Sequence, residues 1–392
     1  MSSAIQLRGL AWDHRRCWGP LEASVPTYRA LQPDIQVAWN RRSLWEFGEG
    51  RLDGPAADYD LVIYDHPFVG EVARDGLMLD LTRFLSADQI ASFADDSLGP
   101  SWRSYGFGGG IWALPIDGAA QVAAYRPDLL SRFADVPPRT LDQVFDLAES
   151  VRTAGMFVGW PSVPTDVMCT LLTIAAGMGH LPSRNAPFLL PRQFAEAMES
   201  LRRLRSVAHP DSPRCNPIAC YDHMSVADDV VYVPYGFGYV NYATPDRDRR
   251  LAFTDIPGVD GAASGALLGG AGIGISARSA NPQAAFDYAM FLCGRDYQSG
   301  DYVRHGGQPG SLAAWSDPDA DTAVGGFFSA TRQTLQNAYL RPTAPGFIDF
   351  FRQSAEWVSD HLSNGDASGD ARMADRLNLC FESCLADAEH AA

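Results

Sequence analysis

Two segments that follow expected β-strands carry the same pair of residues, an aspartate and then a histidine. WDHRR places Asp13 and His14 after the first expected strand, and YDHPF places Asp65 and His66 after the third. In an open α/β sheet, ligands bind beyond the carboxyl ends of the strands, so both pairs are expected to face one cleft. Asp117, which follows a Leu-Pro pair, is a third carboxylate expected near the same place. We predict that these five residues bind a ligand.

Such side chains allow several kinds of chemistry. Carboxylates accept charge-assisted hydrogen bonds from sugar hydroxyls or from a cationic ligand. The same aspartates could instead cap the helices that follow their strands. His14, His66 and Asp65 together would suit zinc or iron, and histidine titrates near neutrality, so acid–base catalysis is open too. We expect ligand binding without a metal or cofactor, and we keep catalysis by His14 or His66 with Asp13 or Asp65 as the alternative.

Aromatic residues would supply the other half of a sugar-like site, because ring faces pack against the apolar faces of pyranoses. The candidates are Trp12, Trp112, Trp160, Tyr235 and Tyr239. Packing in the hydrophobic core is the competing interpretation for each of them. Trp160, in VGWPS, and Tyr235, in a glycine-flanked segment, are the two that we predict to bind ligand.

Several classes of enzyme are excluded by missing residues. All 31 basic residues are arginine, so no lysine is available for a Schiff base or for a Walker-type phosphate loop. The chain has neither a G-x-S-x-G elbow nor an H-E-x-x-H helix, and GFGGGIW does not fit a strand–G-x-G-x-x-G–helix arrangement. Common hydrolase, metalloprotease and nucleotide-binding signatures are therefore absent from the sequence.

Charge and composition limit the partners. The formal net charge is −16, and no basic run offers a phosphate backbone a binding surface, so nucleic acid is not expected as a partner. No apolar stretch reaches the roughly 18 to 20 residues of a membrane span. The seven cysteines form no C-x-x-C pair, so a structural zinc site is not expected, and their odd number favours mostly free thiols in a reducing compartment. Cys215 with Cys220, and Cys380 with Cys384, are the pairs that could approach each other.

The hydrophobic pattern predicts an α/β fold, because short apolar runs alternate with helical periodicity. A glycine-rich segment at 105–115 suggests a first crossing between two lobes, and residues 230–243 suggest the return. We therefore expect two discontinuous lobes, each a mostly parallel sheet flanked by helices, joined by a hinge. Lobe 1 is predicted to comprise 1–116 and 251–310, and lobe 2 to comprise 117–250 and 311–392. The elements expected are strands at 5–12, 35–39 and 60–65 and helices at 21–31, 140–154, 164–178, 191–207 and 281–294.

Three segments resemble a known family. They are LPIDGAAQVAAYRPDLLSRF, DIPGVDGAASGALLGGAGIGISARSANPQAAFDYAMFLCG and HGGQPGSLAAW. Their order and separation are similar to those of the extracellular solute-binding proteins of ABC importers, in the carbohydrate-type group with the type II periplasmic-binding-protein fold. The resemblance implies that loops at Gly269, Gly270, Gln308 and Ser311 approach the ligand. The paired aspartate–histidine motifs depart from the family pattern and leave the ligand class open.

Two functions are consistent with these observations. The first is a monomeric bacterial binding protein that closes around a small polar solute, sugar-like in chemistry, and presents it to an ABC permease or a sensor. The second is a cytoplasmic enzyme evolved on the same scaffold. The first residues, MSSAIQLRGLAWDH, lack the charged and apolar regions of an export signal. They favour the cytoplasm, with a periplasmic or extracellular location as the alternative if a leader has been removed.

Overall fold

A computed structural model describes residues 4–182 and 186–390, and its centre is an eight-stranded sheet. The strand order is β2-β1-β3-β10-β6-β8-β7, and β9 pairs with β6 outside this path. The strands are β1 (Ile5–Trp12), β2 (Ile35–Arg42), β3 (Leu61–Tyr64), β6 (Leu114–Tyr125), β7 (Phe157–Val158), β8 (Val230–Phe237), β9 (Ala252–Thr254) and β10 (Leu268–Ile275). Two short strands, β4 (Gly106–Phe107) and β5 (Gly110–Ile111), form a separate hairpin.

The predicted α/β class is confirmed, and the pairing shows where the sheet is parallel. Strand β1 pairs in parallel with β2 and with β3, and β7 pairs in parallel with β8. Strands β10 and β6 run antiparallel to their neighbours, so the middle of the sheet is mixed. Because β10 comes back from a distant part of the chain, its direction is not set by a βα crossover of the kind that enforces parallel pairing.

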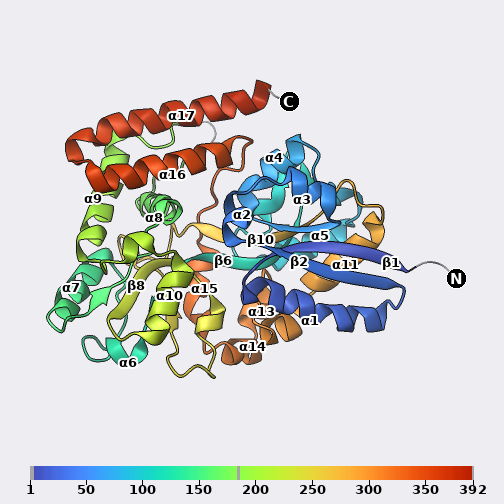
Figure 1. The fold of residues 1–392 in the computed structure, drawn as a ribbon, viewed down its shortest axis with the longest axis horizontal. Helices are drawn as coiled ribbons and strands as arrows, with labels where there is room; N and C mark the ends of the chain where they lie inside the picture. The colour runs from blue at the N-terminus through green and yellow to red at the C-terminus, as the bar shows by residue number, and fades with distance from the viewer. Residues whose placement is uncertain (1–3, 183–185, 391–392) are drawn as a thin grey trace.

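A smaller hydrophobic core lies at the N-terminal end of the sheet, on the right in Figure 1. It joins β1, β3 and β10 to the helices beside them, and its buried side chains include Leu7, Ile63, Ile273 and Tyr288. The helices and helical turns of this half are α1 (Arg15–Leu31), α2 (Leu44–Glu49), α3 (Asp53–Asp58), α4 (Val69–Arg74), α5 (Ala87–Asp95), α11 (Pro282–Cys293) and α12 (Arg295–Tyr297).

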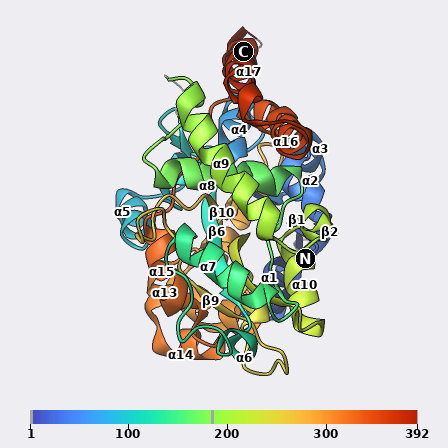
Figure 2. The ribbon, with the colours of Figure 1, turned by 90° about the vertical axis from the view of Figure 1, so that its left-hand side faces the viewer.

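A larger core fills the other half, on the left in Figure 1. Helices α16 and α17 pack against α8 and α9 and cover the top of this half in both views (Figures 1 and 2). The helices of this half are α6 (Pro127–Leu130), α7 (Leu141–Arg152), α8 (Pro164–Gly177), α9 (Pro191–Val207), α10 (Pro217–Val226), α13 (Leu312–Ser316), α14 (Pro318–Ala323), α15 (Phe327–Gln336), α16 (Phe347–Asn364) and α17 (Asp370–His390).

Strand β6 connects the two cores. Leu114 and Ile116, at its start, pack in the smaller core, whereas Ala120 and Val122 pack in the larger one. The strand is twelve residues long and is buried except for partial exposure at its last residue. A single continuous strand therefore belongs to both halves, and its middle lies where the two halves meet.

The chain returns to the smaller core later than the sequence led us to expect. Strand β8 pairs with β6 and β7, and the segment after it contributes Leu251, Phe253 and Leu267 to the larger core. Only from β10 onward do its residues, such as Ala271, pack in the smaller core. Side-chain packing thus assigns residues 251–267 to the larger half, whereas the predicted boundary assigned them to the smaller one.

Two further features bear on the expectations from sequence. Within the described chain, no helix is both long and apolar enough to cross a bilayer. The seven cysteines form no disulfide; Sγ of Cys380 lies 3.9 Å from Sγ of Cys384, which is a contact and not a bond.

Candidate functional site

A cavity of about 370 Å³ lies between the two cores. One wall comes from the ends of β1 and β3, from α1 and α2, and from the start of β10; the other comes from β6, α8, α10, the end of β8 and α16. The lining residues are Trp12, Arg16, Leu44, Trp45, Phe47, Gly48, Glu49, Asp65, Ala119, Val163, Pro164, Thr165, Asp166, Cys169, Asn216, Pro217, Phe237, Tyr239, Gly269, Gly270, Arg341, Phe351 and Glu356. Its size and mixed apolar and polar lining are those of a small-molecule site.

Asp65 lines the cavity at the carboxyl end of β3 and forms an ion pair across it. Nη2 of Arg341 lies 3.0 Å from its Oδ2, and its other oxygen accepts a hydrogen bond from the backbone N–H of His66. Burial favours the protonated acid, but Arg341 and His66 outweigh it and lower the pKa of Asp65 to about 2. Asp65 is therefore a fixed negative charge whose partner is already present in the protein.

Arg16 lies deeper in the same wall, on the first turn of α1. Its Nε and Nη2 donate to the two carboxylate oxygens of Asp117 at 2.8 and 2.6 Å, and its Nη1 donates to the carbonyl of Gly238 at 2.7 Å. Its guanidinium also lies over the ring of Tyr239, 4.6 Å from the ring centre. Although burial opposes the charge, Asp117 raises the pKa of Arg16, so this pair is ionised and rigidly held. Asp117 thus positions Arg16 and does not line the cavity itself.

Asp166 is the third carboxylate of this region, and it has no comparable partner. It lies on the first turn of α8, lines the cavity, and is only 5% exposed. No described residue donates a hydrogen bond to its carboxyl group or forms an ion pair with it. Burial raises its pKa to about 8, and the nearby charge of Glu49 acts in the same direction. This is the one strongly perturbed acid of the cavity wall whose environment opposes its charge.

Glu49 connects the two walls at the end of α2. Its Oε1 accepts a hydrogen bond of 2.6 Å from Oγ1 of Thr165, which belongs to the other half of the protein. Its backbone carbonyl accepts a second bond of 2.6 Å from Nη2 of Arg352 on α16. The cavity is therefore bridged by direct contacts at this edge.

The predicted residues Asp13, His14 and His66 do not line the cavity. Asp13 is exposed and lies 3.4 Å from Arg41. His14 caps α1, because its Nδ1 accepts a hydrogen bond from the backbone N–H of Arg16, and burial together with Arg16 lowers its pKa to about 4. His66 is fully buried behind Asp65, with Nδ1 3.0 Å from Oδ1.

These positions bear on the two chemical alternatives. His14 and His66 do not gather with Asp65 into a group that could hold a metal ion among the residues described. The capping interpretation holds for Asp65, whose carboxylate accepts from the first amide of the helical turn that follows, and it holds for His14 in place of Asp13. Catalysis by His14 or His66 with Asp13 or Asp65 stays a prediction, and of these residues only Asp65 lines the cavity.

Most of the other predicted ligand-binding residues have their polar atoms occupied inside the protein. Nε1 of Trp160 donates to Thr170, and the hydroxyl of Tyr235 donates to the carbonyl of Pro257. The amide of Gln308 donates to the carbonyl of Gly118 and accepts from the backbone N–H of Val240, beside β6 where the halves meet. None of these predicted residues is among the cavity-lining residues, so their ligand contacts stay predictions.

Gly270 does line the cavity, and its backbone explains the glycine. Its φ is +101°, and a Cβ there would lie 2.4 Å from the carbonyl oxygen of Asp117 on β6. A side chain would therefore both strain the backbone and push β10 away from β6. Gly269 lines the cavity beside it, and Tyr239 and Trp12 line it among the aromatic candidates.

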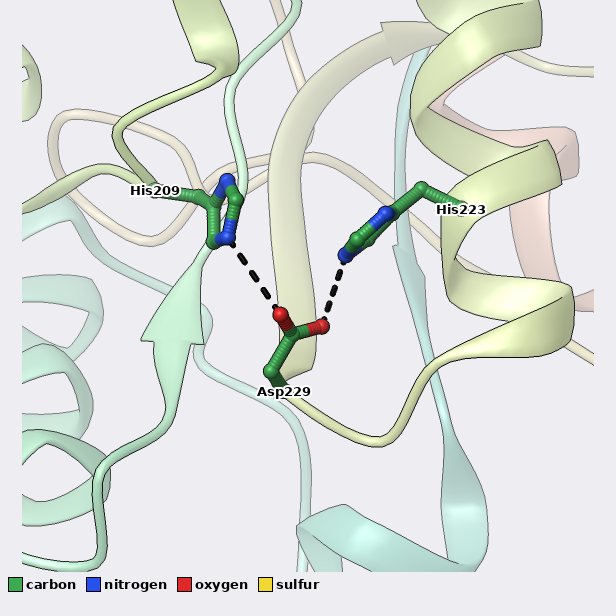
Figure 3. A group of neighbouring side chains, drawn as sticks. All are labelled: His209, His223 and Asp229. Carbon is green, nitrogen blue, oxygen red and sulfur yellow. Dashed lines mark hydrogen bonds and ion pairs between the residues drawn. The ribbon is translucent and has the colours of Figure 1, made fainter.

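A separate cluster could hold a metal ion, away from the cavity. His209, His223 and Asp229 bring one ligand atom each within 4.8 Å of one another (Figure 3). Nε2 of His223 lies 2.7 Å from the carboxylate, and Nε2 of His209 lies 3.4 Å from it. However, Nδ1 of His209 accepts a hydrogen bond from the backbone N–H of Asp211, so a neutral His209 carries its proton on Nε2, facing Asp229. Asp229 is thus hydrogen-bonded to His223 and lies within ion-pair distance of His209, and a metal would have to displace the proton on His209.

Comparison with known proteins identifies relatives. Residues 19–179 match the family described as bacterial extracellular solute-binding protein. A probable ABC transporter-binding protein of Deinococcus radiodurans is 21% identical over 308 residues, which cover 74% of this chain and 71% of the relative. That family is described as extracellular, whereas the sequence led us to expect the cytoplasm; the expectation stays a prediction.

Solved structures share the fold over nearly the whole chain. Maltose-bound MalE3 of T. maritima superposes with a TM-score of 0.82 at 18% identity, covering 97% of this chain and 100% of the other. A solute-binding protein of Thermotoga lettingae bound with tagatose gives 0.81 at 14% identity, with the same coverage. One of Agrobacterium radiobacter in complex with ribitol gives 0.79 at 17% identity, covering 97% and 99%. Together with the sequence match over residues 19–179, these findings confirm the predicted resemblance to the bacterial extracellular solute-binding proteins of ABC transporters.

Proposed function

We propose that this protein binds a small polar solute in the cavity between its two cores and closes around it by a hinge motion. The observation that carries the proposal is the composition of the cavity wall, which draws on the ends of β1 and β3 on one side and on α8 and α16 on the other. A site built from two separately packed halves changes shape when the halves move, which is how binding proteins of this fold trap a ligand.

The two cores serve as the lobes in this proposal, and their connections serve as the hinge. The chain passes between the cores three times: within β6, near Ile116, between Leu267 and Ala271, and again between Tyr302 and Trp315. The side chain of Gln308 connects Gly118 on β6 to Val240, in the helical turn that follows β8. Few segments cross, and each is short, so rotation about them requires small changes in backbone angles.

Relatives with this fold narrow the ligand class to be tested first. Their names give maltose, ribitol and tagatose as the compounds bound. The cavity of about 370 Å³ and its aromatic lining suit a molecule of monosaccharide or disaccharide size. The proposed macromolecular partner of the closed form is an ABC permease or a sensor.

Thermal unfolding and small-angle scattering test the proposal together. A library of sugars, polyols and amines is screened for compounds that raise the melting temperature, and each hit is then examined for a decrease in the radius of gyration. Thr165→Val removes the hydroxyl that bridges to Glu49 without changing side-chain volume, and a lost hydrogen bond of about 1 kcal/mol should weaken binding about fivefold. Thr322→Val, which removes a hydroxyl bonded only within its own helix, is the matched control.

A compound that raises the melting temperature and compacts the protein, with weaker binding in Thr165→Val and unchanged binding in Thr322→Val, supports the proposal. Absence of any stabilising compound, or binding with no change in the radius of gyration, would contradict it.

A further inference from the structure

The charges around the cavity are unbalanced. Its lining includes the carboxylates of Glu49, Asp65, Asp166 and Glu356 and the guanidinium groups of Arg16 and Arg341. Both arginines are already committed, Arg16 to Asp117 and Arg341 to Asp65. Within the described parts of the chain, the remaining three carboxylates have no cationic partner. The free cavity therefore has more carboxyl groups than cations to pair with them.

Asp166 is the most buried of these three unpaired carboxyl groups. A buried carboxylate normally gains two or three hydrogen bonds or a counter-ion, because an unpaired charge away from water costs several kcal/mol. Asp166 is 5% exposed, and no described side chain or backbone N–H donates to its carboxyl group. It does not cap α8 either, since that helix begins at Val163 and Pro164 without a side-chain cap. The group it lacks must come from outside the protein.

Glu49 lies on the opposite wall, and its negative charge acts on Asp166. It is connected to the helix of Asp166 through Thr165, the residue immediately before Asp166, so closing the cavity brings the two acids toward one region. A neutral hydroxyl could donate one hydrogen bond to Asp166 but would leave these carboxyl groups without a cationic partner. An organic cation supplies both the hydrogen-bond donor that Asp166 lacks and a positive charge that balances the carboxylates, because its N–H groups donate charge-assisted hydrogen bonds.

We propose that the ligand carries an organic ammonium group, which binds between Asp166 and Glu49 while the rest of the molecule packs against the aromatic wall. This inference rests on the proposed function, since it names the ligand class of the same cavity. The apolar side of the pocket, with Trp45 and Phe237 among its rings, then contacts the uncharged part of the ligand. Asp65 and Arg341, already paired, orient neutral polar groups.

Matched ligand pairs test the charge directly. Glucosamine is compared with glucose, and choline with 3,3-dimethylbutan-1-ol, so that each ammonium compound has a neutral counterpart of similar shape. Isothermal titration at pH 6.5, where the amine of glucosamine is protonated, should show at least tenfold tighter binding of the ammonium member of one pair. Asp166→Asn, which keeps the side-chain size, should remove that preference and change binding of the neutral member less than twofold. Glu49→Gln is a second variant with the same expected direction.

Asp142→Asn is the control, because Asp142 occupies the first turn of α7 as Asp166 occupies that of α8, yet is 86% exposed and remote from the cavity. It should leave both affinities unchanged. If the neutral member of a pair binds as well as its ammonium counterpart, or if only neutral sugars or polyols of the library bind, the inference is wrong and the proposed function stands. If no compound of either set binds, the proposed function itself fails.

Discussion

Replacing Asp166 by asparagine should stabilise the ligand-free protein, and the gain should grow with pH. The folded state raises the pKa of this carboxyl from 3.8 to about 8. Between these values the unfolded chain has released a proton that the folded protein still holds. Folding is therefore opposed more strongly as the pH rises through this window, and asparagine removes the effect because it does not titrate.

The size of the effect follows from the width of that window. Each pH unit between the two pKa values contributes about 1.4 kcal/mol to the free energy of unfolding. The variant should thus exceed the wild type by about 2 kcal/mol at pH 5 and by about 4 kcal/mol at pH 7, with no further gain above pH 8. Five ionisable groups interact electrostatically with Asp166. They are Glu49 on α2, Cys169 on α8, Cys220 and Tyr221 on α10, and Tyr239 after β8.

Urea unfolding of both proteins at pH 5, 6, 7 and 8 measures the difference. The same measurement on Asp142→Asn should give a loss of at most about 1 kcal/mol at every pH, since this exposed acid gains only from the helix dipole and from a solvent-exposed ion pair with Arg203. A stability difference between Asp166→Asn and the wild type that stays constant from pH 5 to pH 8 would refute the reasoning. So would a variant that is less stable than the wild type at pH 8.

Two other predictions concern the ion pairs of the cavity wall. Arg16→Met should destabilise the protein by about 3 to 5 kcal/mol, because it leaves Asp117 charged, buried and unpaired; adding Asp117→Leu should restore most of the loss in thermal unfolding. Asp65→Asn should cost about 2 kcal/mol at pH 7, since the folded pKa of about 2 lies below the unfolded value of 3.8. That stability difference between the wild type and Asp65→Asn should vanish as the pH falls from 4 to 2. Acid titration of both proteins, monitored by circular dichroism, measures it. A difference at pH 2 equal to that at pH 7 would contradict the prediction.

The elements that local pattern determines were predicted well. Helix α9 and strand β1 have the bounds that periodicity indicated, and α8 differs by one residue at its end. Helix α1 begins six residues earlier than expected, at Arg15, because His14 caps it and two internal prolines did not stop it. Histidine is not among the usual capping residues, so the pattern gave no sign of that start.

The path of the chain between the halves was harder to predict, because it depends on pairing between distant strands. Residues 230–243 have the glycines and aromatic residues of a crossing, yet β8 stays in the larger half because β6 and β7 hold it on both sides. The return instead lies at the glycine pair near the start of β10, where Gly270 passes close to Asp117. Local composition could not distinguish the two places.

The site was predicted only in part for the same reason. Asp65 was proposed because it follows a strand end, where the fold gathers ligand contacts, and Gly270 because the family resemblance implied a loop near the ligand; both line the cavity. The partners that decide their chemistry are distant in sequence: Arg341 is 276 residues from Asp65, and Asp117 is 101 residues from Arg16. No spacing rule connects such pairs. Of the repeated aspartate–histidine motif, only Asp65 lines the cavity.

The sequence did not lead us to predict Asp166 as a ligand-binding residue, because its neighbours in sequence suggest that it stabilises a helix. It stands in PTDVMCTLLTIAAG, where an acid in the first turn of an apolar helix is favourable through the helix dipole. In the structure, burial outweighs the dipole, since the pKa rises where the dipole alone would lower it. A residue that opposes folding, satisfies no cap and faces a cavity has no stabilising role in the free protein. The destabilisation by Asp166 is offset only when a ligand group that donates hydrogen bonds to the carboxylate binds in the cavity. By this argument the selectivity of the cavity depends on α8 and not on the strand ends.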